Sequence, residues 1–154
     1  MEFKKFKAAT VQTSPVFLNV EKTIEKAISF IKEAHENGAK LIAFPEVFIA
    51  GYPYWNWIMT PVQGSKWYEE LYKNSVAVND ASMQKLYKAA KDFDMNIVIG
   101  INERGDSFGE IYNTNLIIDN HGNVIGKHRK LVPTWAEKLT WTSGDGSSLK
   151  VYNT

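Results

Sequence analysis

The first third of the chain places short apolar runs on either side of one amphipathic stretch. Residues 6–12, FKAATVQ, have the pattern of a strand. Apolar side chains then recur at helical spacing, which predicts a helix over residues 19–34 with Asn19 as its N-cap and with Gly38 ending it. Residues 41–44 are apolar without alternation, as in a strand covered on both faces. Residues 6–44 therefore predict a βαβ unit with parallel strands. The expected inner face of the helix is Val20, Ile24, Ala27, Ile28 and Ile31.

The remaining pattern predicts one more helix against the sheet and several strands. Residues 51–75 mix glycine and proline with many Trp and Tyr, and their second half suits a short helix. Asp80 is a candidate cap for a helical stripe, residues 96–103 read as a strand, and residues 110–119 and 123–130 form a hairpin with glycine in its turn. The tail ends in a weak strand, SLKVY. This order predicts an α/β layered fold with a mixed sheet. The stripe comprises Met83, Leu86, Tyr87, Ala90 and Phe93.

Composition narrows the classes of partner. The 154 residues are 44% hydrophobic, which suits one globular domain or part of a larger one. With 18 basic and 17 acidic residues the net charge is +1, so nucleic acid and anionic membranes are not expected partners. No apolar run approaches the roughly 18 residues of a membrane helix, and we predict a cytoplasmic protein. The sequence has no cysteine, which excludes disulfides, thiolate metal sites and an internal thiol nucleophile.

Three positions are candidates for chemistry. Glu46 follows Pro45 beyond a predicted buried strand, where ligand sites of α/β sheets gather, although such carboxylates also cap helices. The run KHRK at 127–130 reads either as a solvated basic edge or as part of a site. Glu137, among tryptophans, either faces water or pairs with a cation in a dry pocket. Sequence spacing does not show that these groups meet, and no pair of histidines has metal-ligand spacing, so we predict no metal.

Two longer motifs resemble the nitrilase superfamily of carbon-nitrogen hydrolases. These are AFPEVFIAGYPYW, which contains Glu46, and HRKLVPTWAEK, which contains Lys130 and Glu137. Together with TWTSGDGS they are more similar to nitrilases than to amidases or carbamoylases. The resemblance implies the N-terminal part of a four-layer αββα sandwich. It also implies Glu46 as general base, Lys130 as the cation that stabilises developing charge, and Glu137 as the group that orders the lysine. The implied substrate-binding residues are Tyr52, Trp57, Thr134 and Trp141.

The absence of cysteine departs from the pattern of that family. The family's nucleophile is a cysteine expected shortly beyond SLKVYNT, so the resemblance implies that residues 1–154 are the N-terminal part of a single domain and need a C-terminal portion of the same enzyme. The complete enzyme would hydrolyse a nitrile to a carboxylic acid and ammonia through a thioester, without metal or organic cofactor. It would form homo-oligomers, either dimers or spirals, for which the aromatic segment 55–72 is a candidate interface.

Two alternatives remain open at this point. An amidase or a cyanide-hydrolysing relative would share Glu46 and Lys130 and would lack the same cysteine. A fragment that is inactive alone and serves only folding and assembly is the alternative from a different class.

Overall fold

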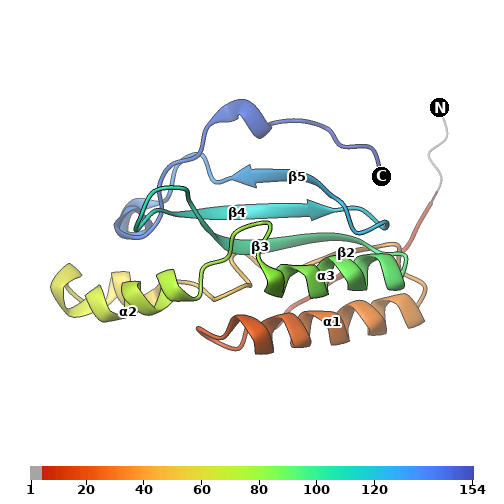
Figure 1. Cartoon of the computed structure of the whole chain (residues 1–154), viewed down its shortest axis with the longest axis horizontal. Coiled ribbons are helices and arrows are strands. Elements are labelled where there is room, and N and C mark those ends of the chain that lie inside the picture. The colour runs from red at the N-terminus through yellow and green to blue at the C-terminus, as the bar shows by residue number, and fades with distance from the viewer. Residues whose placement is uncertain (1–4) are drawn as a thin grey trace.

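The computed structural model describes residues 5–154, which form a mixed sheet with helices on one face (Figure 1). In this part of the chain the sheet has five strands in the order β1-β2-β3-β4-β5. The first three strands are parallel, and β3, β4 and β5 are antiparallel neighbours. The predicted βαβ unit, hairpin and mixed sheet are confirmed. The strands are β1 (Ala8–Thr10), β2 (Leu41–Ala43), β3 (Asn96–Arg104), β4 (Ile111–Ile118) and β5 (Val124–Arg129).

Two helices, α1 (Val20–Glu36) and α3 (Ala81–Asp92), lie side by side beneath the sheet (Figure 1). As predicted, Asn19 caps α1, because its side chain accepts a hydrogen bond from the Lys22 amide at 3.0 Å. Their apolar stripes bury a common core with the inner face of the sheet, which is the main source of stability in such a layer. Fully buried members of this core include Ile24, Ile31, Met83, Leu86, Ile97, Ile99 and Ile101.

The prediction that Asp80 caps the helix is confirmed for its position and wrong for its side chain. Asp80 occupies the N-cap position of α3 but makes no side-chain hydrogen bond to that helix. Its carboxylate instead accepts from the Ala77 amide at 2.9 Å and forms an ion pair with Arg104 at 2.9 Å. Arg104 Nη2 lies 3.0 Å and 2.9 Å from the two carboxylate oxygens, so the carboxylate is engaged in this ion pair rather than with the amides of α3.

The opposite face of the sheet carries no α-helix within residues 5–154 (Figure 1). Ala8, Thr10 and Asn115 are exposed there. The weak strand predicted in the tail is wrong: η3 (Gly146–Ser148) is followed by extended chain without sheet pairing. The tail crosses this face instead, because Tyr152 sits over Gly126 of β5, where an added Cβ would lie 2.4 Å from the ring.

The segment between β2 and α3 extends beyond the ends of the strands. It contains η1 (Tyr54–Trp57) and α2 (Pro61–Lys73), which lies at the left of Figure 1. Thr60 begins α2 as part of a capping box with Gln63, and the expected short helix is confirmed. The later helix η2 (Trp135–Leu139) packs beside η1. These pieces border the carboxyl end of β2.

No helix formed by the described residues is long and apolar enough to cross a membrane.

Candidate functional site

Glu46 is positioned by a tight crossing of its segment over β3. Val47 and Ala50 adopt positive φ values of 40° and 77°, and the turn they form brings Ile49 to β3. Gly100 of β3 makes the crossing possible, since a Cβ there would lie 2.3 Å from the Val47 nitrogen. Glu46 thus stands at the carboxyl end of β2, where the sequence placed it, with its side chain 48% exposed.

Lys130 joins two carboxylates that are far apart in the sequence. Its Nζ lies 3.0 Å from Glu46 Oε1 and 2.8 Å from Glu137 Oε2. The backbone around the lysine is held on both sides, because its amide donates to Asn113 O at 2.8 Å and its carbonyl accepts from Gly144 N at 2.9 Å. The structure therefore brings together the three residues that the sequence singled out for acid-base chemistry. Of the two interpretations of Glu137, the one in which it pairs with a cation is correct.

Glu137 is the buried member of the three, with a side chain 5% exposed. Its Oε2 also accepts from the Thr134 amide at 2.5 Å, and its Oε1 accepts from the Tyr52 hydroxyl at 2.7 Å. Burial favours the neutral acid, but the lysine and these two donors outweigh it and lower the pKa of Glu137. This carboxylate is therefore an anion at neutral pH that fixes the ammonium of Lys130.

The pKa values of Lys130 and Tyr52, which both bind Glu137, are raised. Burial disfavours the charge on Lys130, yet its bonds to Glu137 and Glu46 outweigh that effect and raise the pKa of Lys130. Burial, and then the hydrogen bond to Glu137, raise the pKa of Tyr52. At neutral pH the site accordingly holds a cationic lysine and a neutral tyrosine that donates a hydrogen bond.

The four residues expected to bind substrate, of which Tyr52 is one, lie near Lys130 and Glu137. The Tyr52 ring contacts Trp57 at a centroid distance of 5.5 Å and Trp141 at 5.4 Å. Lys130 Nζ lies 5.9 Å from the centre of the Trp141 ring. Thr134 donates its backbone amide to the Glu137 carboxylate. Contact with a substrate stays a prediction for all four residues.

Sequence reasoning missed two asparagines that organise the site. Asn113 of β4 donates to Glu46 Oε1 at 2.7 Å. Asn102 of β3 is fully buried, donates to Ile49 O at 3.1 Å and Gly51 O at 2.9 Å, and accepts from Trp141 Nε1 at 2.8 Å. The sequence did contain a signal for Asn102, namely an asparagine inside an apolar strand. Asparagine is uncommon in strands, and a buried amide requires hydrogen-bond partners.

The basic run before Lys130 is more than a solvated edge, because two of its cations bind a buried carboxylate. Lys127 and Arg129 both bind Glu103 of β3, at 2.5 Å and 2.8 Å, and the Glu103 side chain is only 3% exposed. Arg129 also lies over the Tyr112 ring at 3.6 Å. These contacts fix the end of β5, and with it the start of the segment that carries Lys130.

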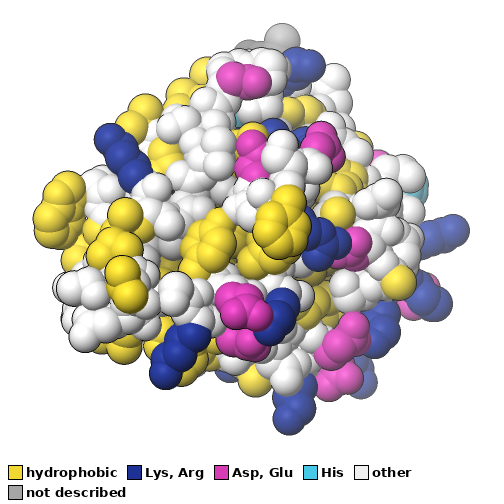
Figure 2. All heavy atoms as spheres, turned by 60° about the vertical axis from the view of Figure 1, so that its left-hand side comes forward, with side chains coloured by type: hydrophobic (Ala, Val, Ile, Leu, Met, Phe, Trp, Pro, Cys, Tyr) yellow, Lys and Arg dark blue, Asp and Glu magenta, His cyan; other side chains and the backbone are white. Residues whose placement is uncertain are grey.

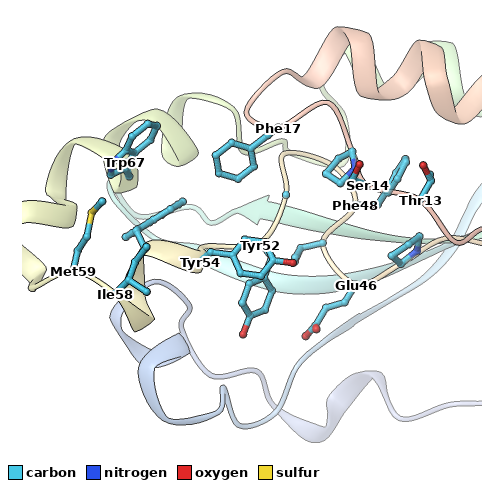
Figure 3. Close-up of a pocket in the computed structure, with 15 residues that line it drawn as sticks. Thr13, Ser14, Phe17, Glu46, Phe48, Tyr52, Tyr54, Ile58, Met59 and Trp67 are labelled. Carbon is cyan, nitrogen blue, oxygen red and sulfur yellow. The ribbon is translucent and has the colours of Figure 1, made fainter.

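Glu46 borders two cavities. The larger, of about 580 Å³, runs from Glu46 and Tyr52 toward η1 and α2 (Figure 3). The smaller, of about 420 Å³, lies on the uncovered face of the sheet, where Asn113, His128 and Lys130 contribute to its lining. Of the expected substrate-binding residues, Tyr52 lines the larger cavity. Within residues 5–154 no cluster of three or more His, Asp or Glu is placed to hold a metal ion.

Comparison with known proteins gives the family. Residues 7–154 match the family described as carbon-nitrogen hydrolase. The chain belongs to the carbon-nitrogen hydrolase family. A nitrilase of Bacillus sp. (strain OxB-1) is 44% identical over 99% of this chain and 44% of its own length. An aliphatic nitrilase of Rhodococcus rhodochrous is 42% identical over 96% of this chain and 40% of its own length. The predicted resemblance to nitrilases is confirmed.

Two further relatives bear on function and fold. A cyanide hydratase of Microdochium sorghi is 39% identical over 97% of this chain and 40% of its own length. An amidase from Nesterenkonia sp. has the same fold, with a TM-score of 0.67 at 22% identity over 90% of this chain and 48% of the amidase. The expected α/β fold class, the N-terminal part of the superfamily fold, is confirmed. This carbon-nitrogen hydrolase chain spans less than half the length of the relatives it matches.

Proposed function

We propose that residues 1–154 are the N-terminal part of a single nitrilase domain and supply its general base and its charge-stabilising lysine. The nucleophilic cysteine would come from a C-terminal portion of the same enzyme. The observation that carries the proposal is Lys130 Nζ within 3.0 Å of both Glu46 and Glu137. The nitrilases among the relatives support the reaction, and in a mutant of the related amidase acrylamide has added at the active-site cysteine.

In this mechanism the cysteine thiolate attacks the nitrile carbon to form a thioimidate, and Glu46 takes the thiol proton. Lys130 stabilises the negative charge that develops on nitrogen, since a fixed ammonium in a partly dry site is an effective electrostatic partner. Water adds, ammonia leaves, and a thioester remains. Glu46 then activates a second water, which releases the carboxylic acid and regenerates the thiol.

Glu137 acts through Lys130 in this scheme. Its ionised carboxylate, held by the Tyr52 hydroxyl and the Thr134 amide, keeps the ammonium within reach of Glu46. Tyr52, Trp57 and Trp141 form an aromatic wall next to that ammonium and are proposed to contact the substrate. Neither a metal nor an organic cofactor enters these steps.

The test uses a reconstituted enzyme, defined as residues 1–154 fused to, or co-expressed with, the part of the Bacillus nitrilase that follows the matched region. We expect it to release ammonia and carboxylic acid from nitriles, whereas the purified 154-residue chain, checked by intact mass for a bound second chain, releases none. Glu46→Gln in the reconstituted enzyme should lower kcat at least 100-fold. Measurable turnover by the chain alone, or full activity of Glu46→Gln, would contradict the proposal.

Cyanide hydratase is the second candidate, because one relative with that name is 39% identical over nearly the whole chain. Product analysis separates the candidates: a nitrilase gives carboxylic acid and ammonia from a nitrile, while a hydratase retains the nitrogen in an amide. An amidase would act on amides and leave nitriles unchanged. If the reconstituted enzyme turns over none of these compounds, a role in folding and assembly alone is the better account of the chain.

The proposal includes a cytoplasmic homo-oligomer, a dimer or a spiral, with segment 55–72 at the contact. The exposed apolar side chains of this segment, Trp57, Ile58 and Val62, support an interface, since clusters of exposed apolar groups mark contact surfaces. Light scattering of the reconstituted enzyme before and after Val62→Glu, an exposed position of α2, tests it. An unchanged mass for a clearly oligomeric protein would remove segment 55–72 from the interface.

A further inference from the structure

We propose that Asn113 is a positioning residue for the general base, because it holds one carboxylate oxygen of Glu46 and leaves the other to accept the thiol proton. Asn113 Nδ2 donates to Glu46 Oε1 at 2.7 Å, and Lys130 Nζ lies 3.0 Å from the same oxygen. Within residues 5–154 no group donates a hydrogen bond to Glu46 Oε2. This inference rests on the proposed nitrilase function and assigns a further residue to that site.

The oxygen Oε1 of Glu46 is fully engaged by these donors. Each oxygen of an ionised carboxylate offers about two lone-pair sites, so Asn113 and Lys130 together occupy those of Oε1. A proton that reaches Glu46 is therefore directed to Oε2. In the proposed mechanism the thiol S–H bond breaks, the proton forms an O–H bond with Oε2, and the sulfur electron pair forms the bond to the nitrile carbon.

The amide of Asn113 suits this contact in one orientation. An ionised carboxylate only accepts hydrogen bonds, so the amide nitrogen rather than the amide oxygen faces Glu46. Asn113 is only 5% exposed, so water has little access to compete for its N–H. A hydrogen bond to a charged acceptor is also stronger than one between neutral groups. The contact therefore restrains Glu46 more than an ordinary polar contact would.

The backbone that carries Asn113 is held on both sides. β4 pairs with β3, where Asn113 lies opposite Asn102, and also with β5. On the β5 side the Asn113 carbonyl accepts from the Lys130 amide at 2.8 Å. A short side chain on an internal strand has few rotatable bonds, whereas lysine carries its charge on a flexible four-carbon stem. Asn113 therefore fixes the position of Oε1 more closely than Lys130 does.

Lys130 has other partners during the proposed reaction. Its Nζ also lies 2.8 Å from Glu137 Oε2, and in the mechanism it stabilises the negative charge that develops on nitrogen. A stronger contact with that nitrogen weakens the contact with Glu46. The Asn113 side chain, by contrast, makes its one hydrogen bond within the described chain to Glu46. It therefore continues to hold Oε1 while the lysine turns to the substrate.

The surroundings of Glu46 are mainly apolar. Figure 2 turns the end of the molecule that carries α2 forward and shows hydrophobic side chains exposed in groups. Figure 3 shows Glu46 apart from Phe17 and Trp67, with its carboxylate pointing toward the C-terminal segment. Apolar side chains donate no hydrogen bonds and do not compete for the carboxylate. Its orientation therefore depends on Asn113 and Lys130.

The experiment compares Asn113→Ala with Asn115→Ala in the reconstituted enzyme. Asn115 is the matched control, because it lies on the same face of β4, is exposed, and forms no side-chain hydrogen bond to Glu46 in the described chain. We expect Asn113→Ala to lower kcat about 10-fold to 100-fold and to leave KM within about twofold, because a hydrogen bond to a charged group is lost. Asn115→Ala should change neither constant. Rates are divided by the concentration of assembled enzyme from gel filtration, so that unfolded protein does not count as slow enzyme.

Two further variants exclude a merely structural role. Asn113→Asp keeps the shape of the side chain but places an acceptor against Oε1, so at pH 8 it should lower kcat at least as much as Asn113→Ala. Asn113→Ala is also combined with Glu46→Gln. A residue that acts through Glu46 loses its effect once the base is removed, so we expect the residual kcat to fall less than about threefold. A structural role would lower kcat by the same factor in both backgrounds.

The outcomes separate this inference from the proposed function. Full activity of Asn113→Ala or Asn113→Asp, an effect confined to KM, or the same factor in both backgrounds would overturn the role of Asn113, even where Glu46→Gln abolishes turnover. Full activity of Glu46→Gln would reject Glu46 as the base, and the role of Asn113 would fall with it. A loss of kcat in Asn113→Ala that disappears beside Glu46→Gln supports the inference.

Discussion

Glu103 is a buried carboxylate outside the candidate site that binds two cations, and its contribution to stability can be worked out. This buried carboxylate of β3 accepts from Thr114 Oγ1 at 2.6 Å, from Lys127 at 2.5 Å, and from Arg129 through two nitrogens at 2.8 and 2.9 Å. Burial alone would favour the protonated form. The cations and the hydroxyl outweigh it and lower the pKa of Glu103 from 4.5 to about 2.

This lowered pKa converts into a free energy of folding. A tenfold change in proton affinity corresponds to about 1.4 kcal/mol, so ionised Glu103 contributes about 3 kcal/mol. Because the folded pKa lies below the unfolded one, this contribution is complete above about pH 4.5 and is lost as pH falls toward 2. Near pH 3 about 1.5 kcal/mol remains.

Glu103→Gln tests this reasoning with little change of shape. We expect the variant to lose about 3 kcal/mol in free energy of unfolding at pH 7, and the difference from the parent to shrink to about half near pH 3. Urea denaturation of the reconstituted enzyme, followed by tryptophan fluorescence at several pH values, measures both quantities. Glu36→Gln is the control, because its ion pair with Lys32 is 3.8 Å long and exposed, and its loss should cost under about 0.5 kcal/mol. A Glu103→Gln difference that is below 1 kcal/mol, or independent of pH, refutes the argument.

Three further predictions follow from single contacts. Lys130→Gln should lower kcat/KM for nitriles about 100-fold to 1,000-fold, while Lys138→Gln, an exposed neighbour, leaves it unchanged; steady-state assays of the reconstituted enzyme decide. Asn102→Ala should lower the free energy of unfolding by about 2–4 kcal/mol in urea denaturation, because three buried hydrogen bonds are lost, and a loss under 1 kcal/mol contradicts this. Trp67→Phe should cost less than about 1 kcal/mol in the same assay, because the buried indole N–H has no acceptor among the described residues; a larger loss would reveal a partner.

Local patterns in the sequence predicted the elements, and with them the place of Glu46. The helical spacing after Asn19 and the apolar run 41–44 are local properties, and parallel pairing of β1 and β2 then brings Glu46 to the carboxyl end of the sheet. Asp80 stands at the N-cap of α3 as predicted, but its side chain makes no capping bond, for a non-local reason. Its competing partner, Arg104, lies on another element and leaves no trace in the local pattern.

The meeting of Lys130 with Glu137 depends on backbone geometry that sequence patterns do not encode. Trp135 adopts φ +41°, which bulky residues rarely adopt, and this turn leads into the short helix that presents Glu137 to the lysine. The buried hydrogen bonds of Asn102 arise in the same way, because they join β3 to two loops that are distant in sequence. Only the family resemblance suggested that the glutamate and the lysine act together.

The contacts that hold Glu46, Lys130 and the segment after Glu137 in place are all made by described residues. Glu46 depends on Gly100 for its crossing, and the backbone of Lys130 is bonded to Asn113. The segment after Glu137 is tied to the sheet by Thr142, whose amide donates to Ile111 O at 2.9 Å. These contacts hold Glu46, Lys130 and Glu137 in place within the described residues, so the proposed C-terminal portion would have to add only the proposed thiol. Complementation by separate chains should therefore restore the same KM as the fusion, with the fraction of assembled enzyme setting the difference in apparent kcat.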